Sequence, residues 1–388
     1  MLKSTALLAA ILYTFSCEGN APSVLKTGAE QPAKYLHLLK GKTGLVVNHT
    51  SNAGDIHLID FLLQQGVEVT KILAPEHGFR GDALEGELVK DGVDKKTGIP
   101  VVSLYGSNRK PLPEHLADLD VLIFDVQDVG ARFYTYISTM HLVMEACAEN
   151  NKPLIILDRP NPNGDYIAGP ILEPKYQSFV GMHPIPVVHG CTVGELALMI
   201  NGEGWLNQGL KCDLTVIPAE NYTHQTRYSL PVPPSPNLPN DLSVRLYPSL
   251  CFFEATSVSV GRGTGFPFQV LGGPKPELGD FTFTPKAPPG AAVRPLNEGK
   301  VCYGIDLRQL KEVPTFTLKY FLGFYSKYEN EKEFLTRENW LNTLAGTDKL
   351  ITQIRQGLSE AEIVKSWEPG LEKYREMRKM YLLYPDFE

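Results

Sequence analysis

The sequence lacks the excess of positive charge that nucleic-acid-binding proteins carry. Its 388 residues include 37 Lys and Arg against 44 Asp and Glu, a formal net charge of −7, so no nucleic-acid partner is expected. Cysteine is scarce too: the chain has six, none in a Cys-x-x-Cys pair, which argues against a zinc ribbon or a thioredoxin-like centre. The cysteines after residue 17 are expected to be buried free thiols, with a disulfide left open: Cys147, Cys191, Cys212, Cys251 and Cys302.

Signatures of several enzyme classes are also missing. No G-x-G-x-x-G follows the first predicted strand and no P-loop is present, so no nucleotide cofactor is expected. Without a G-x-S-x-G elbow, a Ser-His-Asp hydrolase is disfavoured. No H-E-x-x-H helix is present either, and we predict no metal. A metal assembled from separate loops is the open alternative, with His49, His77, His189, Glu76 and Asp128 as its ligands.

The first residues read as an export signal and not as part of the fold. Lys3 precedes an apolar run from Ala6 to Tyr13, which is too short to span a bilayer as a helix. The run ends at Thr14-Phe15-Ser16-Cys17 and resembles a bacterial lipoprotein signal, although Thr14 replaces the usual Leu. We therefore expect lipid on Cys17, a tether over residues 18–30, and a place in the bacterial cell envelope, in the periplasm or at the outer membrane. The alternative is a plain signal peptide with a chance cysteine.

The pattern that follows indicates an α/β fold. Apolar strands are predicted at residues 44–48, 67–74, 99–105, 121–126, 153–158 and 212–217, with helices at 56–65 and 136–149 and from 193 towards 205. Strands that are apolar on both faces and separated by helices form a mostly parallel sheet covered on both sides. The proline-rich run at 231–239 cannot be helix or central strand. We place a domain boundary just before it, giving domains at 31–226 and 227–388.

The second predicted domain is smaller and mixes strands with helices. Strand-like pieces are expected at 255–260, 281–283 and 300–307, and Ser359 with Glu362 forms a capping box that opens a helix near the end. The glycine-rich segment 261–265 is predicted to be a loop that carries Arg262 towards the first domain.

Polar residues collect where the predicted parallel strands end. Carboxyl ends of such strands share one edge of the sheet, where α/β proteins bind ligands, so these residues predict one wide polar crevice. A short strand at 185–188 is expected to add His189. The alternative for any single Asp or Asn is a turn or helix cap. The crevice residues are Asn48, His49, Glu76, His77, Arg80, Asp128, Arg132, Asn161, Asn163 and His189.

The segment Pro75-Glu76-His77-Gly78-Phe79-Arg80-Gly81 is the strongest single candidate for chemistry. Pro75 ends a strand, because it cannot donate to the sheet, and the glycines let the backbone turn closely around a ligand. A charged turn without function is the alternative. Glycoside hydrolysis needs an acid and a second group. Glu76 is the best acid, and Glu87, Asp128 and Glu254 are candidates for the second group.

Ordered blocks along nearly the whole chain resemble the NamZ-type exo-β-N-acetylmuramidases, glycoside hydrolase family 171, formerly a domain of unknown function. They include "GLVVNHTS" from Gly44, "LAPEHGFRG" from Leu73, "FDVQDVGARFYTYISTM" from Phe124, "LDRPNPNG" from Leu157 and "VHGCTVGELA" from Val188, and they continue with "PPSPNLP" from Pro233, "YPSLCFFE" from Tyr247 and "VSVGRGTGFPFQ" from Val258. The resemblance implies a Rossmann-like first domain, a smaller second domain and a cleft between them.

The resemblance also implies the activity, which is release of N-acetylmuramic acid from the non-reducing ends of peptidoglycan fragments such as MurNAc-GlcNAc. It implies catalysis by Glu76 and His77, and substrate binding by the other crevice residues together with Asn237, Glu254 and Arg262. The lactyl group of the sugar is a carboxylate, so we expect an arginine to bind it. Arg80 is the favoured candidate and Arg262 the second, and the other candidates are Arg132 and Arg159. Two further functions stay open: a muropeptide-binding lipoprotein without turnover, and a metal-dependent amide or ester hydrolase.

Overall fold

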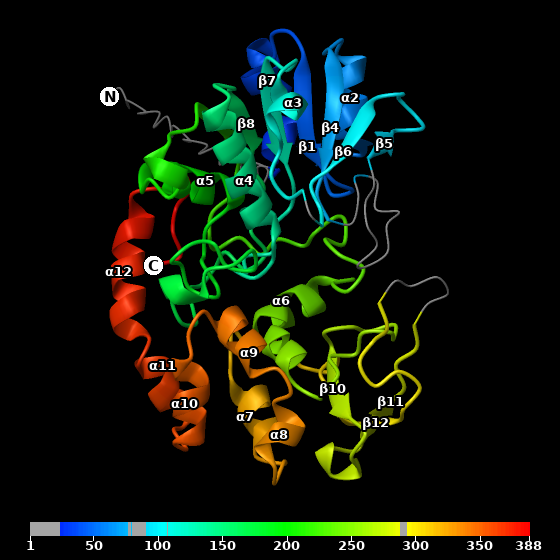
Figure 1. The fold of residues 1–388 in the computed structure, drawn as a ribbon, viewed down its shortest axis with the longest axis vertical. Helices are drawn as coiled ribbons and strands as arrows, with labels where there is room; N and C mark the ends of the chain where they lie inside the picture. The colour runs from blue at the N-terminus through cyan, green and yellow to red at the C-terminus, as the bar shows by residue number, and fades with distance from the viewer. Residues whose placement is uncertain (1–23, 77–78, 80–90, 107, 288–292) are drawn as a thin grey trace, which may run out of the picture.

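The computed structural model describes residues 24–388 except 77–78, 80–90, 107 and 288–292. Within them, a seven-stranded sheet runs in the order β5-β6-β4-β1-β7-β8-β9 (Figure 1). The six strands from β6 to β9 are parallel, and β5 pairs antiparallel with β6 at one edge. Their bounds are β1 Thr43–Val47, β4 Val69–Ala74, β5 Gly92–Val93, β6 Pro100–Ser103, β7 Val121–Asp125, β8 Leu154–Leu157 and β9 Leu214–Ile217.

Both faces of this sheet are buried, as the unbroken apolar strands predict. In β1, Leu45 and Val47 pack with α2 (Leu58–Gln64), whereas Val46 between them packs on the other face with α4 (Tyr136–Glu149). Helix α5 (Val193–Gly202) shares the α4 face. This alternation confirms the predicted α/β class, and we call the sheet with these helices the sheet domain. Its smaller elements are α1 Pro32–Tyr35, β2 Asn52–Ala53, β3 Ile56–His57, α3 Pro113–Leu116 and the 3-10 turns η1 Gly28–Glu30, η2 Leu36–Leu38, η3 Pro174–Tyr176 and η4 Asn207–Gly209.

The second domain combines a small antiparallel sheet with short helices. Its strands follow the order β10-β12-β11. Their bounds are β10 Val270–Gly273, β11 Phe281–Phe283 and β12 Cys302–Asp306, with η6 Pro276–Leu278 between β10 and β11. The helices are α6 Asp241–Leu250, η5 Cys251–Ala255, α7 Lys319–Tyr325, α8 Glu331–Phe334, α9 Glu338–Ala345 and α10 Lys349–Arg355.

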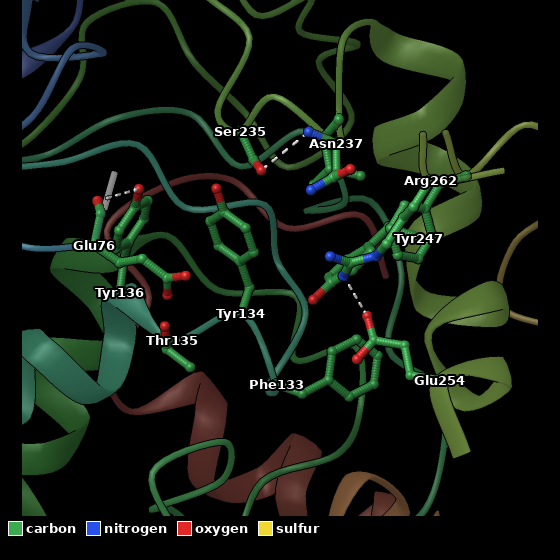
Figure 2. A pocket seen from close by; sticks show the side chains of 12 residues that line it. Glu76, Phe133, Tyr134, Thr135, Tyr136, Ser235, Asn237, Tyr247, Glu254 and Arg262 are labelled. Atoms are coloured by element: carbon green, nitrogen blue, oxygen red, sulfur yellow. Dashed lines mark hydrogen bonds and ion pairs between the residues drawn. The ribbon is translucent and has the colours of Figure 1, made fainter. Parts of the chain in front are cut away.

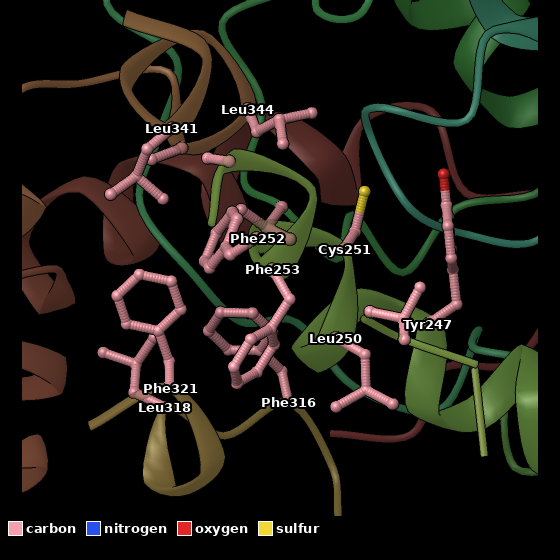
Figure 3. Packing of buried hydrophobic residues seen from close by; sticks show 14 of the residues in the cluster. Tyr247, Leu250, Cys251, Phe252, Phe253, Phe316, Leu318, Phe321, Leu341 and Leu344 are labelled. Carbon is pink, nitrogen blue, oxygen red and sulfur yellow. The ribbon is translucent and has the colours of Figure 1, made fainter. Parts of the chain in front are cut away.

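An aromatic core holds the second domain together (Figure 3). Phe252 and Phe253 of η5 point into it. The ring of Phe252 meets Phe316 edge-on at 5.9 Å between centroids, and the ring of Phe253 lies 5.4 Å from Phe321. Aromatic pairs in such geometries stabilise a core beyond the area they bury. This packing fixes η5, which also carries Glu254.

The end of the chain returns to the sheet domain. Helix α11 (Glu360–Lys365) begins at the predicted capping box, and α12 (Glu368–Lys379) then runs along the side of the molecule, red in Figure 1. The hydroxyl of Tyr374 donates to the carbonyl of His189 at 2.7 Å, and Arg378 donates to that of Gly190. The last residues therefore pack on the same domain as the first ones.

Two predicted strands are wrong, each for a local reason. Residues 185–188 form only isolated bridges from Val188 to Ala131 and Ala168, because Pro184 and Pro186 have no N–H to donate to a ladder. Residues 255–260 contribute only single bridges, at Thr256 and Ser259. The hydroxyls of those two residues accept from Val258 N and Gly261 N, a local pairing that competes with a sheet.

The predicted helix at 56–65 starts two residues late, because Ile56 and His57 pair with β2. The other predicted elements of the sheet domain appear with shifts of a few residues at their ends. In the part of the chain that the structure describes, no helix is long and apolar enough to cross a membrane.

Candidate active site

A pocket lies where the two domains meet, and both contribute to its wall (Figure 2). The sheet domain supplies Glu76, after β4, and the segment from Phe133 to Tyr136, which leads into α4. The proline-rich connection and the second domain supply the rest, which is Ser235, Asn237, Leu238, Tyr247, Glu254, Arg262 and Phe268. The pocket therefore exists only when the two domains are packed together.

Glu76 is held at the end of β4 in an environment that favours its protonated form. Burial raises the pKa of its carboxyl, whereas a hydrogen bond from Tyr105 and the charges of Arg262 and Arg109 lower it in part. Its backbone carbonyl accepts from the hydroxyl of Tyr136 at 3.3 Å. A carboxyl with a raised pKa can keep a proton closer to neutral pH and donate it during a reaction.

Glu254 is the second carboxylate of the pocket, and Arg262 is its ion-pair partner. Nη2 of Arg262 lies 2.5 Å from Oε1 of Glu254. Burial raises the pKa of Glu254 to about 7; Arg337 and Trp340 oppose the shift, and the nearby charge of Glu76 adds to it. The contact with Arg262 favours the ionised carboxylate. Burial lowers the pKa of Arg262 to about 10, so the guanidinium stays charged at neutral pH.

Glycines place Arg262 in the wall. Gly261 and Gly263 on either side of it have φ values of +80° and +78°, a backbone region that other residues rarely adopt. A Cβ on Gly263 would also lie 2.9 Å from the carbonyl of Lys286. The predicted role of this segment, a loop that brings Arg262 to the site, is consistent with this geometry.

Five aromatic side chains line the pocket beside these charges, Phe133, Tyr134, Tyr136, Tyr247 and Phe268. The rings of Tyr134 and Tyr136 meet edge-on with centroids 5.0 Å apart, and Tyr247 lies 5.3 Å from Phe133. The hydroxyl of Tyr134 donates to the carbonyl of Pro234 at 2.7 Å, and burial raises the pKa of both Tyr134 and Tyr136. The wall is thus apolar on its ring faces, with neutral hydroxyls at fixed points. The sequence prediction missed these rings; the run Phe133-Tyr134-Thr135-Tyr136, directly after Arg132, was the available signal.

Among the predicted site residues that the structure describes, Glu76, Asn237, Glu254 and Arg262 come together in the pocket wall. Asn237 lies on the turn of the proline-rich segment, where its N–H donates to the hydroxyl of Ser235 at 3.2 Å. These residues come from separate stretches of the chain, which is the kind of convergence that a binding site needs.

Other predicted crevice residues lie after strand ends as expected, except His189, whose predicted strand does not form, and all of them are buried. Oδ2 of Asp128 accepts from Gly130 N at 2.7 Å and lies 3.5 Å from Nε2 of His189. The amide of Asn161 donates to Cys191 O, and that of Asn163 donates to Val129 O. Asn48 accepts from the backbone and hydroxyl of Thr50. These contacts shape the loops that support the pocket.

The remaining predicted residues lie elsewhere or outside the described residues. His49 contacts the carbonyl of Pro233 through Nε2 at 2.9 Å. The guanidinium of Arg132 is fully buried, where it donates to four backbone carbonyls, those of Pro170, Ile185, Leu344 and Ala345. Arg159 makes a two-pronged ion pair with Asp125. His77, Arg80 and Glu87 lie outside the described residues, as does Cys17.

Arg262 is therefore the one of the four candidate arginines that the described structure puts in the pocket wall. Among the described residues, no three His, Cys, Asp or Glu side chains gather in a way that could hold a metal ion.

Comparison with known proteins identifies relatives over almost the whole chain. The family models described as exo-beta-N-acetylmuramidase NamZ, N-terminal and C-terminal, match residues 43–242 and 245–384. The peptidoglycan beta-N-acetylmuramidase NamZ of Bacillus subtilis (strain 168) is 40% identical over 373 residues, which cover 90% of this chain and 89% of the relative.

Solved structures of two DUF1343 family proteins from Bacteroides fragilis NCTC 9343 have the same fold. One is 46% identical with a TM-score of 0.86, covering 94% of this chain and 100% of its own. The other is 30% identical with a TM-score of 0.81, covering 93% of this chain and 99% of its own.

Proposed function

Because the chain belongs to the NamZ family of exo-β-N-acetylmuramidases, we propose that it releases N-acetylmuramic acid from the non-reducing ends of peptidoglycan fragments. The observation that carries this proposal is the pocket itself. This chain is matched by both family models, and its pocket brings two carboxylates and an arginine together within an aromatic wall. Carboxyl groups with a raised pKa in a pocket are typical of catalytic sites. They therefore favour turnover of the ligand over binding without turnover.

Glu76 acts as the general acid in this proposal. Its proton passes to the glycosidic oxygen as the bond to the anomeric carbon breaks, and the departing sugar leaves as an alcohol. The raised pKa of Glu76 supplies the proton at a pH where an exposed glutamate would be ionised. The ionised carboxylate of Glu254 supplies negative charge to the oxocarbenium-like sugar that forms. Water then adds to the anomeric carbon to give free N-acetylmuramic acid, and the proton that the water releases restores the acid form of the enzyme.

Arg262 recognises the lactyl carboxylate that distinguishes N-acetylmuramic acid from N-acetylglucosamine. The guanidinium already pairs with one carboxylate in the wall, and its planar fork of donors suits a second one. The aromatic rings of Tyr134 and Tyr247 provide apolar surface for the sugar ring beside it. His77 and Arg80 keep their predicted roles in catalysis and lactyl binding, as proposals from the sequence.

The protein is proposed to work outside the cytoplasm, held to a membrane by lipid on Cys17. The support is the apolar run that ends at Cys17 and the substrate, because peptidoglycan fragments arise in the cell envelope. A lipid anchor would keep the enzyme where these fragments are released.

A chromogenic N-acetylmuramide tests the activity, with and without a chelator. The wild type should hydrolyse it in both conditions, and Glu76→Gln should reduce kcat by about 10²–10⁴-fold, the usual contribution of a general acid. Glu220→Gln, at an exposed glutamate that pairs with Lys26, is the matched control and should retain full activity. Loss of wild-type activity with chelator would favour a metal-dependent hydrolase, and binding without turnover would favour a muropeptide-binding protein.

A further inference from the structure

A second groove opens on helix α9, outside the pocket wall. It has a volume of about 700 Å³ and is lined by six consecutive or nearly consecutive residues, Thr336, Arg337, Glu338, Asn339, Trp340 and Thr343. Arg337 and Asn339 are exposed, and Trp340 is half-buried. None of these residues lines the pocket that holds Glu76, so the mechanism above does not use them.

The groove and the pocket share a structural support. The carbonyl of Ala255 accepts from the N–H groups of Thr336 and Arg337 at 3.1 and 3.0 Å. Ala255 is the last residue of η5 and directly follows Glu254. The charge of Arg337 and the indole of Trp340 both lie near enough to Glu254 to lower the pKa of its carboxyl. The α9 groove therefore begins beside one of the two pocket carboxylates.

The chemistry of the groove combines a cation, an aromatic ring and uncharged polar groups. The guanidinium carbon of Arg337 lies 5.2 Å from the centroid of the Trp340 ring, a stacking that orients the cation. Glu338 is paired with Arg355 instead, with Oε2 of Glu338 2.7 Å from Nη2. Within the part of the chain that the structure describes, Arg337 takes part in no ion pair. An aromatic ring with an oriented guanidinium suits an acidic sugar.

We propose that the α9 groove binds the leaving side of the peptidoglycan fragment, an acidic amino-sugar chain, with Trp340 against a sugar ring and Arg337 on the carboxylate of the next N-acetylmuramic acid. This rests on the proposed function, because an exo-acting enzyme that holds the terminal sugar in its pocket must accommodate the rest of the fragment outside it. The groove beside Glu254 offers that place.

Three substrates separate the groove from the pocket. A chromogenic N-acetylmuramide fills the pocket alone, the disaccharide MurNAc-GlcNAc adds a neutral leaving sugar, and the trisaccharide MurNAc-GlcNAc-MurNAc adds a carboxylate beyond it. In Arg337→Ala, the ratio of kcat/KM for the trisaccharide to that for the muramide should fall roughly tenfold, mostly through KM, as expected for a lost charge-assisted contact. The disaccharide should change less. Trp340→Ala should weaken use of both saccharides.

The ratio distinguishes binding in the groove from an indirect effect on Glu254, because a change in Glu254 would slow all three substrates alike. Lys175→Ala is the matched control: Lys175 also lies over an aromatic ring, that of Tyr176 at 4.9 Å, but outside the groove. An unchanged ratio in Arg337→Ala, or an equal loss on every substrate, overturns the groove proposal.

Failure of the wild type to hydrolyse the muramide would instead overturn the proposed function. In that case, calorimetric titration of the trisaccharide into the wild type and Arg337→Ala tests the groove by itself. Weaker binding to the variant supports the groove, and equal binding overturns it.

Discussion

The two carboxylates of the pocket differ in the residues that stabilise their charge. Arg262 pairs with Glu254 at 2.5 Å, whereas Glu76 accepts a hydrogen bond from Tyr105 and has its pKa lowered in part by the charge of the same arginine. One site can hold an acid and an anion together when the surroundings of its two carboxyl groups favour different protonation states. We propose that the direct ion pair with Arg262 keeps Glu254 ionised although burial raises its pKa to about 7, which leaves Glu76 as the acid.

Tyr105 should set the pH range over which Glu76 stays protonated. Burial raises the pKa of Glu76, and the hydrogen bond from Tyr105 lowers it by favouring the ionised form. In Tyr105→Phe, that opposing contact is lost, so the pKa should rise further and activity should persist to higher pH. The measurement is the profile of kcat/KM against pH, whose basic limb should move upward.

A matched control for this prediction is Tyr325→Phe, which removes a similar contact to Glu331, at 3.1 Å, outside the pocket. Its pH profile should equal that of the wild type. A basic limb that stays in place or moves to lower pH in Tyr105→Phe would remove Tyr105 from this role, or Glu76 from the role of the acid.

Arg262 should determine the preference for N-acetylmuramides over N-acetylglucosaminides. Arg262→Lys keeps a positive charge beside Glu254 but loses the planar fork that binds two carboxylates. The ratio of kcat/KM for the two substrates should therefore fall roughly tenfold, as expected for loss of one charge-assisted contact. Arg245→Lys is the control, because Arg245 pairs with Asp165 at 2.5 Å outside the pocket wall. An unchanged ratio in Arg262→Lys would assign lactyl recognition to another residue.

At the scale of elements, local patterns predicted the sheet domain well. The apolar runs became β1, β4, β7 and β8, and Thr192 caps α5 by accepting from Glu195 N at 3.2 Å. Pro75 marks the end of β4, so the residue types around it are enough to single out Glu76. These features depend on neighbouring residues, which is why the sequence reveals them.

Long-range packing explains what the sequence did not reveal. The burial of Arg132 depends on the carbonyls of Leu344 and Ala345, more than two hundred positions along the chain. The aromatic wall likewise joins Tyr134 to Tyr247. No local pattern in the sequence marks such long-range contacts. The segment 185–188 shows in addition that an apolar run alone does not make a strand, because proline cannot donate to a sheet.

The C-terminal segment should contribute to stability through one hydrogen bond. The hydroxyl of Tyr384 donates to Oδ2 of Asp158 at 2.5 Å, and Thr192 and Gly194 donate to the same carboxylate at the start of α5. Tyr384→Phe removes one donor from a buried carboxylate. The free energy of unfolding should fall by about 1.5–3 kcal/mol, as for other hydrogen bonds to charged groups.

The effect of Tyr384→Phe should depend on pH. Burial raises the pKa of Asp158 to about 6, so the folded protein takes up this proton more readily than the unfolded chain. Stability from this group is therefore present below about pH 4, the ordinary range of Asp, and lost as the pH rises through about 6. The variant should lose more stability at pH 8, where Asp158 is ionised, than at pH 5.

Chemical denaturation at the two pH values measures this difference. Tyr381→Phe is the control, because Tyr381 donates to the carboxylate of Glu203 on the surface, at 2.7 Å, where such contacts contribute little. Equal losses in the two variants would contradict a special role for Tyr384.

For the whole molecule, the pocket depends on how the two domains are held. The C-terminal helix α12 and the residues after it pack on the sheet domain, and Arg132 of that domain donates to the end of α9 in the second. The second domain is thus attached at the proline-rich connection and again through α12 and Arg132. Several attachments hold Glu76 and Glu254 in a fixed relation, as the proposed reaction on a sugar bound between the two carboxyl groups requires.

The final prediction concerns where this molecule resides. The apolar run that ends at Cys17 should direct export and lipid attachment, and one acyl chain alone holds a protein only marginally, so stable anchoring needs more than one. Cys17→Ala should be exported and recovered in the soluble extracytoplasmic fraction, whereas the wild type should sediment with membranes and dissolve only in detergent. Metabolic labelling with a fatty acid should mark the wild type alone. Cys302→Ala, which removes a buried thiol, controls for loss of a cysteine and should remain membrane-bound. If the wild-type chain is fully soluble after export, the lipoprotein proposal is wrong, although the pocket and its chemistry would be unaffected.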